Sequence, residues 1–130
     1  MRALLLAMVV TGCSHHARTD DVEDVDAPPG DYELACESHA TTFPLLDRSC
    51  TVATDCVIAN HMIDCCGTFS AIGINIVSES AFAAAENTCE AGFPGCGCAS
   101  RPTMAEDGRT QADGPIALRC ENQVCRTYVP

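Results

Sequence analysis

The chain has 130 residues, and its 18 acidic residues against 7 basic ones give a formal net charge of −11. All seven basic residues are arginine. Because nucleic-acid binding requires a basic surface that neutralises phosphates, this composition excludes nucleic acid as a partner.

The N-terminal segment predicts export and lipidation. Residues 3–10 form an apolar run of eight residues behind Arg2, too short to span a bilayer but long enough for a signal peptide. Val10, Thr11, Gly12 and Cys13 then resemble the bacterial lipoprotein signal, in which an aliphatic residue and two small ones precede a cysteine. The resemblance implies that residues 1–12 are removed and that Cys13 carries acyl chains such as palmitate, so that membrane lipid is a partner.

An ordinary signal peptide, with Cys13 as one more disulfide partner, is the alternative. The chain has eleven cysteines, an odd number, and ten remain if Cys13 is lipidated. Two or three acyl chains are enough for stable anchoring. Ser14 follows Cys13, where the resemblance implies that an aspartate would favour the inner membrane, so the outer membrane is the expected location.

Residues 13–33 form the second segment, predicted to be the lipidated cysteine followed by an acidic tether. Between positions 14 and 33 there are seven acids and one arginine. With few apolar side chains to offset the ordering cost, this stretch is expected to be disordered and extended. His15 and His16 alone make a poor metal site.

Residues 34–130 are expected to form one small domain stapled by disulfides. Its ten cysteines exceed the level that indicates a disulfide scaffold, which suits an oxidising, exported location. They are Cys36, Cys50, Cys56, Cys65, Cys66, Cys89, Cys96, Cys98, Cys120 and Cys125. Neighbouring cysteines should have different partners, because adjacent Cα atoms are too close for an unstrained bridge. Spacing alone leaves the rest of the connectivity open.

Within this domain, the pattern predicts a small disulfide-rich α+β fold. Residues 55–59 read as a short strand, and residues 71–76 as a strand or a buried loop. Ser78 is a plausible N-cap for a helix over residues 79–90, with Phe82, Ala85 and Cys89 on its inward face and Gly92 just after its end. Residues 116–120 and 124–129 predict a hairpin, so the helix is expected to pack on one short antiparallel sheet that includes this hairpin.

Several motifs in order resemble small cysteine-rich lipoproteins of unknown function from high-GC Gram-negative bacteria. They are TDCVI, DCCG, AIGIN, a helix ending in Cys89, Cys96-x-Cys98 and Cys120-x4-Cys125, within residues 50–126. The resemblance implies no activity. The pattern Cys50-x5-Cys56-x8-Cys65-Cys66 more weakly resembles four-disulfide-core modules, some of which inhibit proteases. An inhibitor with a protease-facing loop around Arg101-Pro102 or Arg109 is therefore an alternative.

Catalytic chemistry has little support in the sequence, and we expect no enzyme activity and no cofactor. A catalytic cysteine would need a low pKa and a histidine partner, and the domain has only His39 and His61. Asp55 and Asp64 are expected to cap turns, and Glu106 and Asp107 to be solvated in a polar loop. Metal binding through free thiols is a further alternative, although Cys-Cys and Cys-x-Cys fit common zinc spacings poorly.

These observations together predict a lipid-anchored cell-envelope protein with a non-catalytic domain in a binding or structural role. Its protein ligand, if it has one, cannot be named from the sequence. No catalytic residue and no metal ligand is assigned.

Overall fold

The computed structural model describes residues 32–130, so the predicted signal peptide and most of the tether lie outside the described residues. In chain order, this part contains the 3-10 turn η1 (Ala53–Asp55), strands β1 (Cys56–Met62) and β2 (Phe69–Asn75), the 3-10 turn η2 (Ile76–Ser78), helix α1 (Glu79–Ala91), and strands β3 (Ala117–Glu121) and β4 (Val124–Tyr128). With five disulfides, this is the small disulfide-rich α+β fold that the sequence predicts.

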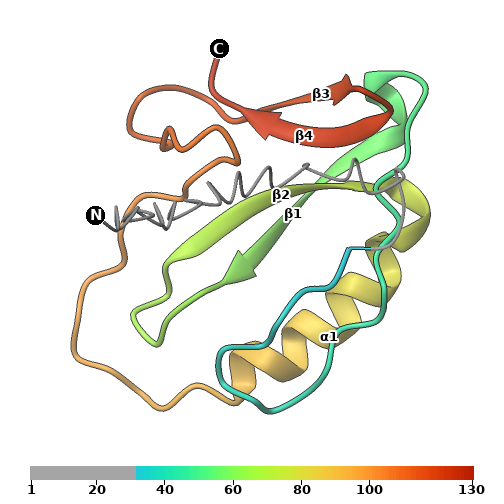
Figure 1. The fold of residues 1–130 in the computed structure, drawn as a ribbon. Coiled ribbons are helices and arrows are strands. Elements are labelled where there is room, and N and C mark those ends of the chain that lie inside the picture. Colours follow the sequence, from blue (N-terminus) through green and yellow to red (C-terminus); the bar gives the residue numbers. More distant parts are fainter. Residues whose placement is uncertain (1–31) are drawn as a thin grey trace, which may run out of the picture.

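The β1–β2 hairpin is the middle layer, with α1 on one side and the β3–β4 hairpin on the other (Figure 1). Its two strands pair antiparallel, from Cys56 opposite Asn75 to Met62 opposite Phe69. Because side chains alternate along a strand, one set faces the helix and the other faces β4. His61 contacts Glu86 of α1, whereas Cys56 is bridged to Cys125 of β4.

Helix α1 confirms the prediction for residues 79–90, with one residue more at its C-terminal end. Phe82, Glu86 and Cys89 are its buried residues, so Glu86 belongs to the inward face where the sequence pattern had only apolar residues. Ser78 does occupy the N-cap position, but its side chain makes no capping hydrogen bond. Its Oγ instead accepts the backbone N–H of Asp47 at 2.9 Å, which ties the helix start to the loop before β1.

The C-terminal hairpin also forms as predicted, with a tight turn in which Asn122 and Gln123 both have positive φ. It makes its own two-stranded sheet and does not extend β1–β2, in contrast to the single sheet expected. Close stacking of the layers explains why position 73 is glycine. A Cβ on Gly73 would lie 2.7 Å from the carbonyl carbon of Cys125 in β4, and that backbone cannot move aside without disrupting the hairpin.

The apolar core is small and lies between α1 and the β1–β2 hairpin. Its buried members are Leu46, Ala59, Ile72, Ile74 and Phe82. The segment before β1, for which the sequence supported no firm prediction, closes this core: Tyr32 exchanges backbone hydrogen bonds with Leu46 at 2.9 and 3.2 Å. Since a core of this size stabilises a small domain only modestly, the disulfides are the natural supplement.

Candidate functional site

All ten cysteines of the described region are joined in five disulfides with ordinary Cα–Cα distances of 5.2 to 5.8 Å. The pairs are Cys36–Cys89, Cys50–Cys120, Cys56–Cys125, Cys65–Cys96 and Cys66–Cys98. The prediction that neighbouring cysteines go to different partners is confirmed for Cys65 and Cys66, and for Cys96 and Cys98. A thiol nucleophile or a thiolate metal site among these ten residues would therefore require prior reduction.

Sulfur atoms from different bridges lie close to one another in two clusters. The Sγ atoms of Cys50, Cys56 and Cys125 lie within 4.8 Å of one another, and so do those of Cys65, Cys96 and Cys98. All members of the first cluster are buried, whereas Cys96 and Cys98 in the second are exposed. Both clusters consist of disulfide sulfur atoms, and they differ in their access to solvent.

A buried arginine joins the middle layer to β4. The Arg48 side chain donates from Nε to the carbonyl of Gly73 at 2.8 Å and from Nη2 to the carbonyl of Cys125 at 2.7 Å. Its guanidinium lies 4.7 Å from the centre of the Tyr32 ring. Such an arginine needs a counter-charge, because an unpaired charge inside a protein is costly.

That counter-charge is Glu106, and the prediction that this carboxylate is merely solvated is wrong. Glu106 accepts hydrogen bonds from Arg48, from the backbone N–H groups of Gly73 at 3.1 Å and Thr127 at 2.8 Å, and from Arg126 at 3.2 Å. Its side chain is only 14% exposed. The polar loop thus folds inward at this residue, and Glu106 stabilises the contact between β2 and β4.

A second buried polar pair joins α1 to β1. His61 Nδ1 lies 2.7 Å from one carboxylate oxygen of Glu86, and the other oxygen accepts the backbone N–H of Met62 at 2.7 Å. The rings of His61 and Phe43 are also nearly perpendicular to each other, with ring centres 5.2 Å apart. Because His61 is 3% exposed and Glu86 5%, the pair does not present a general base to a substrate, and its role is to fix the helix on the hairpin.

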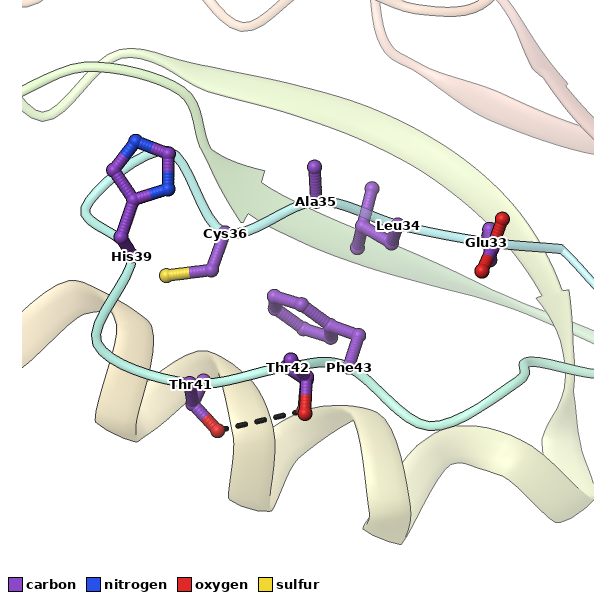
Figure 2. Close-up of a pocket in the computed structure, with 8 residues that line it drawn as sticks. All are labelled: Glu33, Leu34, Ala35, Cys36, His39, Thr41, Thr42 and Phe43. Atoms are coloured by element: carbon purple, nitrogen blue, oxygen red, sulfur yellow. Dashed lines mark hydrogen bonds between the residues drawn. The ribbon is translucent and has the colours of Figure 1, made fainter.

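The groove shown in Figure 2 is formed within one loop, with a volume of about 480 Å³. Its lining comes from the two arms of the loop and from His39 at the bend: Glu33, Leu34, Ala35, Cys36, His39, Thr41, Thr42 and Phe43. Cys36 is bridged to Cys89, and the Phe43 ring stacks on Phe82 at 5.7 Å, so α1 supports the groove from below. His39 and Glu33 are exposed, so the groove lacks the buried polar group that would orient a ligand.

The two arginines predicted for a protease-facing loop differ in how firmly their side chains are held by other residues. Arg101 has a side chain that is 73% exposed and makes an ion pair with Asp64 at 3.2 Å. Arg109 donates to the carbonyl of Val129 at 2.6 Å and to that of Pro130 at 3.2 Å, which holds its guanidinium against the C-terminus. The inhibitor hypothesis stays a prediction, and Arg101, whose side chain is largely exposed, is the better candidate for it.

The prediction that Asp55 and Asp64 cap turns is confirmed. Asp55 accepts the backbone N–H groups of Thr51 at 2.7 Å and Val52 at 3.0 Å, and Asp64 accepts those of Cys66 and Thr68, each at 3.0 Å. The donated N–H of Thr68 is the main reason that the pKa of Asp64 is lowered, with the Arg101 side chain a smaller contribution. Hydrogen bonds to the ionised form favour that form.

We expect the folded state to lose stability in acid, in part through Asp64. A carboxylate whose pKa is lowered by folding stabilises the protein above its unfolded value of about 3.9, and this contribution disappears as the pH falls through the folded value. In urea unfolding, the wild type should exceed Asp64→Asn in stability at pH 7, and the difference should shrink toward about pH 2. Glu37→Gln is the control, because Glu37 accepts no hydrogen bond within residues 32–130. A wild-type advantage over Asp64→Asn that stays constant with pH would contradict the assignment.

Comparison with protein-family models, with curated proteins and with solved structures finds no match to this chain. The resemblance to small cysteine-rich lipoproteins therefore stays a prediction. Residues 32–130 contain no helix long and apolar enough to cross a membrane.

Proposed function

We propose that this protein is an exported, lipid-anchored envelope protein whose disulfide-braced, non-catalytic domain has a binding or structural role. The observation that carries the proposal is the closed set of five bridges among the ten cysteines of the domain. Such a set forms and persists in oxidising compartments, which supports export. It also leaves Cys13, the one cysteine outside the ten of the domain, without a partner in the domain and so supports lipidation there.

The described side chains favour binding or structure over catalysis. The two buried ionisable pairs, Arg48 with Glu106 and His61 with Glu86, are occupied in holding the three layers together. The groove over α1 is open and lined by one loop, which suits weak contact with a protein or a small apolar group better than reaction chemistry.

The test is the intact mass of the full chain purified from the membranes of a Gram-negative host, with thiol blocking before and after reduction. We expect a chain that begins at Cys13 with added acyl mass, no blocking before reduction, and ten blocked thiols after it. Cys13→Ser is the matched control and should lose both the acyl mass and the membrane fraction. An unmodified Cys13 in the wild type would reject the anchor, and thiols that react before reduction would reject the closed set of bridges.

A further inference from the structure

The two sulfur clusters lie at opposite ends of β1. Cys56, in the buried cluster, is the first residue of that strand, and Cys65, in the exposed cluster, follows its last residue by three positions. The exposed cluster belongs to two neighbouring bridges, Cys65–Cys96 and Cys66–Cys98, which join the same two surface segments. The turn after β1 supplies Cys65 and Cys66, and the chain after α1 supplies Cys96 and Cys98.

The segment that carries Cys96 and Cys98 is held almost entirely by these bridges. We call residues 94–100 the strap; it leaves the end of α1 and passes around the outside of the β1–β2 turn (Figure 1). Every residue of the strap is exposed. Within the described part of the chain, no hydrogen bond involves a strap residue, and the next hydrogen bond along the chain runs from the backbone N–H of Arg101 to Thr68 Oγ1 at 3.1 Å.

Solvent access decides which bridges an external thiol can attack. Thiol–disulfide exchange requires a thiolate to approach one sulfur of the bridge, so exposed disulfides are the labile ones and buried disulfides resist reduction. In the other three bridges neither cysteine is exposed: Cys36, Cys56, Cys89 and Cys125 are at most 6% exposed, Cys50 is 8% exposed, and Cys120 is half-buried. Opening the buried bridges Cys36–Cys89 and Cys56–Cys125 requires that the core opens first, whereas opening Cys65–Cys96 or Cys66–Cys98, the strap bridges, does not.

From this geometry we infer that Cys65, Cys66, Cys96 and Cys98 form a thiol–disulfide exchange site, reduced by an external dithiol ahead of the other bridges, which releases the strap. One thiolate of the dithiol bonds to Cys98 Sγ, the Cys66–Cys98 bond breaks, and Cys66 leaves as a thiolate that takes up a proton. The second thiol of the reductant then displaces Cys98 and closes the reductant's own disulfide. The protein gains two electrons and two protons, and the dithiol loses them.

The crowding of sulfur atoms supplies the next step. Once freed, the Cys98 thiolate has the sulfurs of Cys65 and Cys96 within 4.8 Å, so it can attack their bridge without an outside reagent. A new bond forms from Cys98 to one of the two sulfurs, and the other leaves as a thiolate, so the number of disulfides is unchanged. The partner implied is a protein dithiol of the same compartment, and the inference does not depend on lipidation of Cys13.

The first test is stepwise reduction of the oxidised full chain with dithiothreitol, followed by alkylation and peptide mapping. We expect Cys65, Cys66, Cys96 and Cys98 to be alkylated at least tenfold faster than Cys56 and Cys125, with a plateau of four thiols and an unchanged far-ultraviolet circular dichroism spectrum. The inference is overturned if any other bridge opens as fast, or if the strap bridges open only as the protein unfolds.

The second test compares two single substitutions that each leave one cysteine beside an intact bridge. Cys66→Ser leaves Cys98 beside Cys65–Cys96, and new bridges from Cys98 should appear at pH 8. Cys120→Ser leaves Cys50 within 4.8 Å of Cys56 and Cys125, and because this cluster is buried, Cys56–Cys125 should persist. A Cys66→Ser protein that keeps only Cys65–Cys96 would overturn the exchange step. If either variant fails to fold, the order in which the disulfides of the wild type are reduced is the test of the inference.

Discussion

Replacing Glu106 by alanine should lower the free energy of unfolding by about 3–5 kcal/mol, the usual cost of removing one partner of a buried ion pair. The substitution leaves the Arg48 guanidinium inside the protein with no counter-charge, since Arg48 is only 6% exposed. It also removes the acceptor for the backbone N–H groups of Gly73 and Thr127. Both losses fall on the contact between β2 and β4.

The control for this prediction is Glu121→Ala in the C-terminal hairpin. Glu121 pairs with Arg119 at 3.1 Å, but both side chains are more than 40% exposed, and surface pairs of this kind contribute about 0–1 kcal/mol. Urea unfolding of both variants, with all five disulfides intact, measures the difference. Equal losses in the two variants would show that Glu106 acts as an ordinary surface residue.

Glu106 also shows where sequence reasoning about this chain stops. The residues that follow it up to position 114 are mostly polar and include Gly108 and Gly114, so local composition predicts solvation. Its main partner, Arg48, is 58 residues away in the chain, and no local pattern reports such a contact. Local elements fare better: the alanine-rich helix and the C-terminal hairpin were predictable because their signals lie within single segments.

The disulfides show the same contrast between what local sequence predicts and what depends on the folded chain. That Cys65 and Cys66 have different partners follows from covalent geometry alone, and so was predictable. Which partners they choose depends on the path of the strap around the β1–β2 turn, with sequence separations of 31 and 32 residues. The exposure that distinguishes the strap bridges from the buried ones is likewise a property of the folded layers.

The His61–Glu86 pair left a weak signal that sequence reasoning missed. Glu86 lies four residues after Phe82 and three before Cys89, so it shares their helix face. Ala85 fits that face in the sequence pattern because it is apolar, whereas an acid on an inward face departs from that pattern. A carboxylate at such a position indicates a buried donor on the opposing element, here His61 and the N–H of Met62.

Replacing Glu86 by alanine should therefore lower the free energy of unfolding by about 2–6 kcal/mol, because it leaves two buried hydrogen-bond donors without an acceptor, at about 1–3 kcal/mol each. The donors are His61 Nδ1–H and the backbone N–H of Met62. Glu79→Ala is the control on the same helix: Glu79 is exposed in the first turn, where a carboxylate contributes about 0.3–1 kcal/mol. Denaturant unfolding at neutral pH compares the two.

The double variant His61→Leu/Glu86→Leu distinguishes a specific pair from general damage to the core. Replacing both partners of a buried pair by apolar groups is often neutral, whereas removing one is costly. Only the N–H of Met62 then stays unsatisfied, so the double variant should lose about 1–3 kcal/mol, less than Glu86→Ala alone. A loss equal to the sum of the losses measured for His61→Leu and for Glu86→Leu would mean that His61 and Glu86 stabilise the domain independently. Recovery in the double variant would instead show that the carboxylate is retained in the core to satisfy the histidine it faces.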